Sequence, residues 1–494
     1  MILTGGNILF LGSIIIFTSV IVSSKLSSKA GVPMLLLFLI AGMFFGCDGL
    51  GIQFDNVKTA QAIGMFALSI ILFSGGLDTS FSEIKPVIRH GAVLSTAGVI
   101  LMTLFTGTFI WLLLHFFGRS ADSEIMTFPM CLLLAAVMSS TDSASVFNIL
   151  RSQNVGLRKH LRPLLELESG SNDPMANMLT VVLIQICMGG ESITGWSIAG
   201  TFMLQFFVGI ICGVLFGRAF VWVFNKIRLN NSALYPILML CIIFFAFSIT
   251  DMLHGNGYLA VYLTGIIMGN RPLVKKKECT QFLDGITWLC QIVMFIALGL
   301  LVVPHEMVDV ALLGTVIGIF MIFIGRPLAV FVSLLPFKKP NFKARLYASW
   351  VGLRGASPII FATYPVVAGV AGGQKIFNIV FFITILSLLI QGTTIIWMAK
   401  KLDMVRELPR TGNVFGVELP EEIDSKLWDM KVTDEMLRRG NQLKDMSVPQ
   451  GVLVIMIKRG EDYLVPNGTL EMKKDDLLLL IGQRDTDQEL VLQA

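Results

Sequence analysis

Thirteen long apolar runs dominate the sequence and restrict what the chain can fold into. They lie at residues 7–24, 32–46, 60–77, 91–117, 128–150, 163–188, 196–224, 233–250, 257–269, 286–303, 310–335, 345–368 and 376–399. A helix needs about 20 mostly apolar residues to cross the hydrocarbon core of a bilayer. Only 15% of the residues are charged, against about a quarter in a soluble globular protein. We therefore expect an all-α polytopic membrane protein with about thirteen transmembrane helices.

The basic residues of the loops predict the orientation of these helices. When the loops are taken alternately, one set carries 18 Lys and Arg residues and the other carries only Lys58, Arg119 and Lys375. Cytoplasmic loops are enriched in Lys and Arg. The N-terminus is thus expected outside and the tail after Lys401 in the cytoplasm. The run 7–24 has no basic leading segment or cleavage site, which favours a first span over a removed signal peptide.

The tail has a different composition from the rest of the chain. Residues 403–494 hold 12 basic and 18 acidic residues, a net charge of −6, whereas residues 1–402 hold 26 and 16, a net charge of +10. Short alternating apolar segments, with turns at Arg459-Gly460 and Asn467-Gly468, predict β-strands. No G-x-G-x-x-G motif occurs in the tail. We expect a transmembrane domain over 1–402 and a small cytoplasmic α+β domain over 403–494, with no enzymatic activity and no nucleic-acid partner.

The segment ESGSNDP, residues 168–174, places polar groups inside the sixth apolar run. Charge within hydrocarbon is costly and usually marks a functional site. On a helix with 100° per residue, Glu168, Ser169, Asn172 and Asp173 share one broad face. Nine further apolar residues must follow Asp173 to reach the far side of the bilayer. The segment therefore predicts an oxygen-rich site for a hard monovalent cation, centred on Asp173.

Two further polar breaks interrupt the fifth and twelfth runs. In VMSSTDSASV, residues 137–146, hydroxyl residues surround Asp142, and we expect Thr141 and Asp142 at an unwound point. In WVGLRGASPII, residues 350–360, glycines and a proline surround Arg354, a permanent cation. The partner of Arg354 is expected to be Glu168 or Asp173. By contrast, Arg218 and Arg326 lie near the ends of apolar runs and are expected to snorkel to the interface.

The positions of the two breaks predict the architecture of a transporter. If spans 1–6 and 8–13 are two inverted repeats, the fifth and twelfth spans correspond, and these are the two with breaks. The site is then expected near the midplane, where the sixth span passes both breaks. A proton and a cation would compete there for one carboxylate, which favours an antiporter. A ligand-gated cation channel and a transporter-like receptor remain as alternatives.

With these motifs in place, residues 1–400 resemble the NhaP-type cation:proton antiporters, a group of sodium/proton exchangers. The resemblance rests on ESGSNDP (168–174), STDSASV (140–146) and GLRGASP (352–358). It implies that Asp173 carries the ion and the proton and that Ser169 and Thr141 supply cation oxygens. It also implies that Asn172 binds a Glu168–Arg354 pair. A homodimer of thirteen-helix subunits, with electroneutral exchange in a bacterial inner membrane, is further implied.

The tail resembles the TrkA C-terminal domain, a regulator of potassium conductance. The resemblance rests on the strands, the turn and the P-x-G-x-L and D-x-L-x-x-x-G patterns between Val448 and Gly482. It implies regulation by a small ligand, such as a nucleotide, and favours K⁺ over Na⁺ as the transported cation. No resident cofactor is expected.

Overall fold

The structure is a computed structural model of the 494-residue chain. It describes residues 12–13, 16–17, 20–21, 33–117, 126–153, 155–158, 160–189, 195–407, 415, 425–434, 436–445, 451–460 and 462–483. The chain divides into two compact units, Met1–Arg406 and Glu407–Ala494. Each unit is described by itself.

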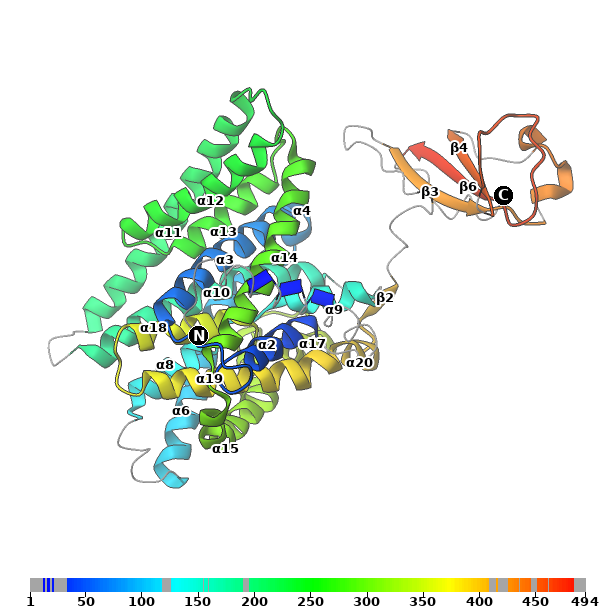
Figure 1. The fold of residues 1–494 in the computed structure, drawn as a ribbon. Helices are drawn as coiled ribbons and strands as arrows, with labels where there is room; N and C mark the ends of the chain where they lie inside the picture. The colour runs from blue at the N-terminus through cyan, green and yellow to red at the C-terminus, as the bar shows by residue number, and fades with distance from the viewer. Residues whose placement is uncertain are drawn as a thin grey trace. The chain divides into compact units, whose positions relative to one another are not determined.

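One group of helices in the first unit packs mainly within itself (Figure 1). Its members are α2 (Met34–Phe45), α3 (Val57–Asp78), α11 (Gly195–Lys226), α12 (Leu234–Met252), α13 (Gly257–Gly269) and α14 (Lys276–Leu301). The helices α3 and α13 approach closely because glycines face each other. A Cβ atom on Gly76 would lie 2.5 Å from the Tyr262 carbonyl oxygen, and one on Gly265 would lie 2.5 Å from that of Phe73. Small residues of this kind allow tight helix packing in membranes.

The second group contains the polar motifs. Its members are α5 (Ile88–Val93), η1 (Leu94–Gly98), α6 (Val99–Phe117), α8 (Phe128–Val137), α9 (Ser143–Ser152), α10 (Leu161–Met188), α15 (Pro304–Phe320), η2 (Met321–Gly325), α16 (Arg326–Ser333), α17 (Phe342–Trp350), α18 (Ala356–Val367), α19 (Gly373–Ser387), η3 (Leu388–Gly392) and α20 (Thr393–Lys401). The three η segments are π turns that join helices into longer rods. A short helix, α4 (Phe81–Ile84), follows α3.

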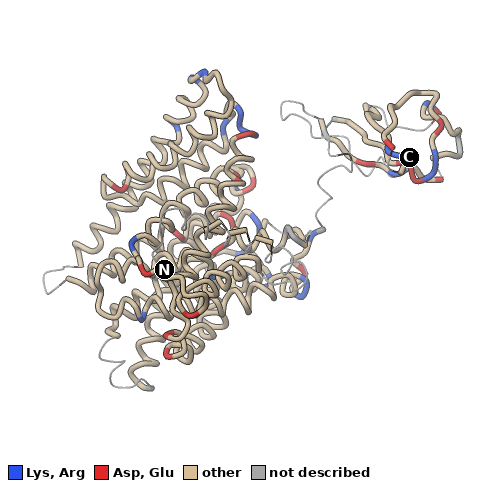
Figure 2. The backbone as a smooth tube through the Cα atoms, viewed as in Figure 1, with Lys and Arg blue, Asp and Glu red and all other residues tan. Residues whose placement is uncertain are grey.

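The apolar runs of the sequence coincide with these helices. Seven helices among the described residues are long and apolar enough to cross a membrane, and four shorter apolar helices accompany them. Each predicted run after the first overlaps a helix or a pair of helices. Of the first, 7–24, only residues 12–13, 16–17 and 20–21 are described. Figure 2 shows that most residues along these helices are uncharged. The chain is a multi-pass membrane protein.

Two stretches without helical structure separate short helices of the second group. Residues 138–142 lie between α8 and α9, and residues 351–355 lie between α17 and α18. These are the places where hydroxyl, glycine and proline residues oppose regular helix in the sequence. By contrast, α10 continues through Pro174 over 28 residues.

A small contact that the sequence did not indicate joins the segment after α9 to the end of α20. The strand β1 (Val155–Leu157) pairs with β2 (Val405–Glu407) in a two-stranded sheet. The backbone N–H of Arg158 donates to the Met404 carbonyl at 2.9 Å. Its guanidinium pairs with Asp403 at 3.1 Å, on the exposed surface.

The second unit is a small α+β unit built on an antiparallel sheet in the order β3-β6-β4-β5. Its strands are β3 (Ser425–Lys431), β4 (Val452–Arg459), β5 (Asp462–Leu464) and β6 (Leu477–Gln483), with 3-10 turns η4 (Met436–Arg439) and η5 (Leu443–Asp445). The expected turn at Gly460 joins β4 to β5, and Gly460 has a φ of 61°. A compact core that includes Ile457, Leu478 and Leu480 holds the sheet together.

Candidate functional site

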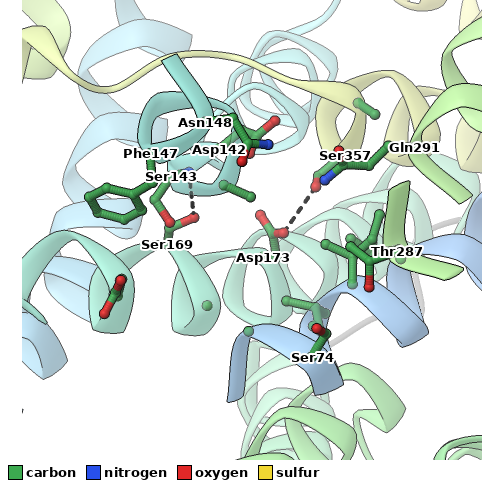
Figure 3. A pocket seen from close by; sticks show the side chains of 18 of the residues that line it. Ser74, Asp142, Ser143, Phe147, Asn148, Ser169, Asp173, Thr287, Gln291 and Ser357 are labelled. Carbon is green, nitrogen blue, oxygen red and sulfur yellow. Dashed lines mark hydrogen bonds between the residues drawn. The ribbon is translucent and has the colours of Figure 1, made fainter. Parts of the chain in front are cut away.

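A cavity of about 300 Å³, lined by both polar and apolar side chains, lies within the first unit. Its lining includes residues of α3, α9, α10, α14 and α18 (Figure 3). Asp78, Arg162 and Asp284 line it and are exposed, whereas Asp173 and Gln291 line it and are buried. The cavity therefore leads from the surface to the carboxylate of Asp173.

Asp173 is 6% exposed, and its carboxylate is bound by two hydroxyl groups. The Ser140 hydroxyl donates to Oδ1, and the Ser357 hydroxyl donates to Oδ2 at 2.9 Å. Ser357 is the second residue of α18, so the amino-terminal end of that helix, which is partially positive, lies beside the carboxylate. Among the residues that the structure describes, no lysine or arginine pairs with Asp173.

The two non-helical stretches contact each other directly beside this carboxylate. The backbone N–H of Asp142 donates to the Leu353 carbonyl at 2.8 Å. The guanidinium of Arg354, 3% exposed, donates to the backbone carbonyls of Ser139, at 3.0 Å, and Ser140. These carbonyls follow the carboxyl end of α8, where partial negative charge gathers. Arg354 therefore neutralises the end of α8.

Close approach at this crossing requires a glycine. A Cβ atom on Gly355 would lie 2.1 Å from Asp142 Oδ2. The carboxylate of Asp142 accepts from the backbone N–H of Ser145 at 3.0 Å and from the Ser145 hydroxyl. Asp142 thus occupies the capping position before α9, where a carboxylate satisfies free backbone N–H groups.

Thr141, Ser169 and Asn172 form one hydrogen-bonded group between α10 and the first stretch. The Ser169 hydroxyl donates to the Thr141 carbonyl at 2.7 Å and accepts from the Ser143 N–H at 3.0 Å. The Asn172 amide nitrogen donates to the Thr141 hydroxyl at 2.5 Å. The structure therefore brings these predicted residues together within the wall of the site.

The partner of Glu168 differs from the expected one. Glu168 binds the guanidinium of Arg326, and the two side chains are 1% and 3% exposed. The expectation that Arg326 snorkels to the interface was wrong. Arg326 opens α16 directly after the π turn η2, and Gly352 leaves room for it, since a Cβ atom there would lie 2.7 Å from Arg326 Nε.

Arg354 and Asn172 therefore have other partners than expected. Arg354 binds the backbone carbonyls of the first stretch instead of Glu168, although the two charges lie near each other. Asn172 binds Thr141 instead of a Glu168–Arg354 pair. The first difference follows from the position of Arg326, which provides the hydrogen bond to Glu168 that Arg354 was expected to make.

Comparison with known proteins identifies the group to which this arrangement belongs. The profile of the family described as "Sodium/hydrogen exchanger, transmembrane" matches residues 13–401. The chain belongs to the sodium/hydrogen exchanger family. The profile of the TrkA-C domain matches residues 439–490. Both resemblances noted in the sequence are thereby confirmed.

Individual exchangers of this family are similar over most of the chain. The K(+)/H(+) antiporter NhaP2 of Shewanella oneidensis is 36% identical over 480 residues, which cover 96% of this chain and 80% of that protein. The K(+)/H(+) antiporter NhaP of Alkalimonas amylolytica is 38% identical, with 95% and 80% covered. The sodium proton antiporter MjNhaP1 of Methanocaldococcus jannaschii shares the fold, with a TM-score of 0.66 and 21% identity, over 80% of this chain and 99% of that one.

The sequence of this exchanger did not single out every residue that lines or supports the site. Ser140 and Ser357, which bind Asp173, lie within the two polar breaks but were not predicted as site residues. Gln291, in the cavity wall, passed unnoticed within an apolar run. A polar residue within an apolar run, such as Gln291, itself indicates a functional position, because uncompensated polar groups are costly in hydrocarbon.

Proposed function

We propose that the protein is an antiporter that exchanges a monovalent cation for protons, with Asp173 as the group that binds each in turn. The observation that carries this proposal is a buried carboxylate at the inner end of the cavity, whose side-chain hydrogen-bond partners among the described residues are two hydroxyl groups. A carboxylate without a resident cation can take up either a proton or a metal cation. Each hydroxyl has lone pairs as well as a proton, so Ser140 and Ser357 can turn their oxygens to an arriving cation.

K⁺ is the proposed cation, with Na⁺ next. The relatives named above as K(+)/H(+) antiporters support this choice. Ser169 and Thr141 are proposed to add oxygen ligands, and the capping role of Asp142 fixes the stretch that carries Thr141. Glu168, Asn172 and Arg354 brace the site. Exchange is proposed to be electroneutral, because a single carboxylate binds either one proton or one monovalent cation.

The architecture proposed for transport has thirteen crossings in two inverted repeats. In this arrangement α8 with α9, and α17 with α18, are each one crossing broken at its middle. The cavity opens beside Asp78, Arg162 and Asp284, near the ends of α3, α10 and α14 that adjoin the basic loops. We infer that this is the cytoplasm-facing state, with the N-terminus outside and the C-terminal domain in the cytoplasm of a bacterial cell.

Regulation is assigned to the C-terminal domain. We propose that the domain 403–494 controls exchange through a small ligand, with a nucleotide as the first class to test, and that the antiporter works as a homodimer in the inner membrane. The TrkA-C match supports a regulatory module, since its core strands, β4 and β6, lie within residues 439–490.

Transport by purified protein in liposomes tests the proposal. With an imposed pH gradient, addition of K⁺ or Na⁺ should release protons through the wild type and not through Asp173→Asn. Asp309→Asn, an exposed carboxylate on α15 outside the cavity lining, is the matched control and should behave as the wild type. Exchange that survives Asp173→Asn would move the site elsewhere. Cation flux that neither saturates nor requires protons would favour a channel.

A further inference from the structure

One wall of the cavity carries a polar stripe that the proposed mechanism does not use. Asp284, Thr287 and Gln291 line the cavity and lie on α14 at spacings of three and four residues. Side chains at such spacings share one face of a helix. The stripe therefore extends along the cavity from exposed Asp284 to buried Gln291. It stands on the helix group that does not carry Asp173.

Gln291 has an unused ligand atom at the inner end of this stripe. Its side chain is 4% exposed, and its amide oxygen has no hydrogen-bond partner among the described residues. In Figure 3, Gln291 extends toward Ser357 and Asp173 from the opposite wall. The hydroxyl oxygen of Thr287, one turn away, also lacks a partner in the described structure.

An unpartnered buried amide is costly unless something occupies it. A purely structural role would be served as well by a methionine, which has nearly the same length and shape without the amide. The amide oxygen is a hard, neutral ligand of the kind that alkali cations accept. Asp173 provides a charged oxygen and Ser357 a hydroxyl oxygen in the cavity lining, and the Ser140 hydroxyl binds Asp173 from behind this lining.

We propose that Gln291 is a ligand of the transported cation and a determinant of its selectivity, since its side chain extends toward Asp173 from the opposite wall of the cavity. This rests on the proposed function and deepens it. Because Gln291 belongs to the other helix group, the cation would contact both groups in the state described here. A larger cation spans this separation more readily than a smaller one, so Gln291 would favour K⁺ over Na⁺.

The test compares two substitutions of the same length with opposite chemistry. In proteoliposomes with a fixed pH gradient, Gln291→Met removes the oxygen, whereas Gln291→Glu keeps one. For Gln291→Met we expect the half-saturating K⁺ concentration to rise about tenfold, because the apparent affinity for K⁺ falls by the same factor. The K⁺ to Na⁺ preference should fall with it, while the maximal rate is retained. Gln291→Glu should bind K⁺ at least as tightly as the wild type.

The control is Gln281→Met, an exposed glutamine on the same helix outside the cavity lining, which should leave both constants unchanged. Equal half-saturating K⁺ concentrations in Gln291→Met and the wild type would overturn the proposal. So would a loss of maximal rate in both Gln291 variants with an unchanged K⁺ to Na⁺ preference, because that pattern indicates packing alone. In either case the wild type would still exchange cations for protons and Asp173→Asn would not. Failure of this proposal is therefore distinct from failure of the proposed antiport.

Discussion

Glu168 and Asp173 lie on the same helix, five positions apart, and are both buried, yet their surroundings differ in kind. Glu168 is bound to the guanidinium of Arg326, a fixed charge that stays with it. Asp173 is bound by the hydroxyls of Ser140 and Ser357 and adjoins a cavity. The charge of Glu168 is already neutralised by Arg326. The charge of Asp173 is held by neutral hydroxyl groups, so Asp173 can bind a cation and release it. This difference is what the proposed role of Asp173 requires.

Removing the arginine that pairs with Glu168 should have the largest effect on the stability of the fold. Arg326→Leu leaves Glu168 buried without its partner, and breaking a buried ion pair in this way costs about 3–5 kcal/mol. We expect a clear fall in the midpoint of thermal unfolding of the purified protein in detergent. Asp173→Asn removes a charge that pairs with no lysine or arginine in the described part of the chain, so it should leave the midpoint near that of the wild type.

Two further variants make this comparison sharper. Arg218→Leu, on an exposed position of α11, controls for loss of an arginine and should leave the midpoint unchanged. The double variant Glu168→Leu with Arg326→Leu removes both charges and should recover most of the loss, because neither partner is stranded. A double variant no more stable than Arg326→Leu would show that the arginine acts through packing.

The contrast between the two carboxylates was only partly visible in the sequence. Each helix that crosses lipid needs apolar side chains along its own length, so the apolar runs predicted the helices. The cost of charge in hydrocarbon identified Asp173 and the two breaks as unusual. The partner of Glu168 lies 158 positions away in an apolar run, and only packing chooses between Arg326 and Arg354. The π turn before Arg326 likewise has no sequence signal that we recognised. Long-range choices between similar side chains require the fold.

A smaller effect is expected where neutral groups hold the site. Asn172 donates to the Thr141 hydroxyl, and both residues are buried. Thr141→Val removes this acceptor but keeps the backbone carbonyl that Ser169 binds. We expect a loss of about 1.5 kcal/mol in the free energy of unfolding, since a buried donor loses its partner. Cation-dependent proton release should weaken but persist.

Comparison with Asn172→Leu tests whether the hydrogen bond is the cause. If it is, the double variant Thr141→Val with Asn172→Leu should lose less unfolding free energy than the two single variants lose together, because each single change already breaks the same hydrogen bond. Strictly additive losses in thermal unfolding would show that the two side chains act independently. Complete loss of exchange in Thr141→Val would instead place the Thr141 hydroxyl among the essential cation ligands.

The smallest effect concerns a paired carboxylate in the C-terminal unit. Asp476 in the C-terminal unit accepts from Arg459 Nε at 2.9 Å and Nη2 at 2.7 Å, and from the Lys473 N–H at 2.7 Å. Burial raises the pKa of the Asp476 carboxyl. These hydrogen bonds together lower it by more than burial raises it, so the pKa lies below its ordinary value of 3.8. The charged form therefore stabilises the fold above pH 3.8, and this contribution is lost as the pH falls through the lowered pKa.

Asp476→Asn should consequently destabilise the sheet by about 1 kcal/mol at neutral pH, since Arg459 is partly exposed and solvent screens the pair. Amide hydrogen exchange of β6 in the full-length protein, corrected for intrinsic rates, measures the loss. The difference from the wild type should shrink as the pH falls from 3.8 toward the lowered pKa, below which the wild-type carboxyl is also neutral. Asp434→Asn, at an exposed pair with Lys474, should show no difference at any pH. A pH-independent difference for Asp476→Asn would mean that shape at this position matters more than charge, unlike the pair at Glu168, where the missing cation leaves a charge that water cannot reach.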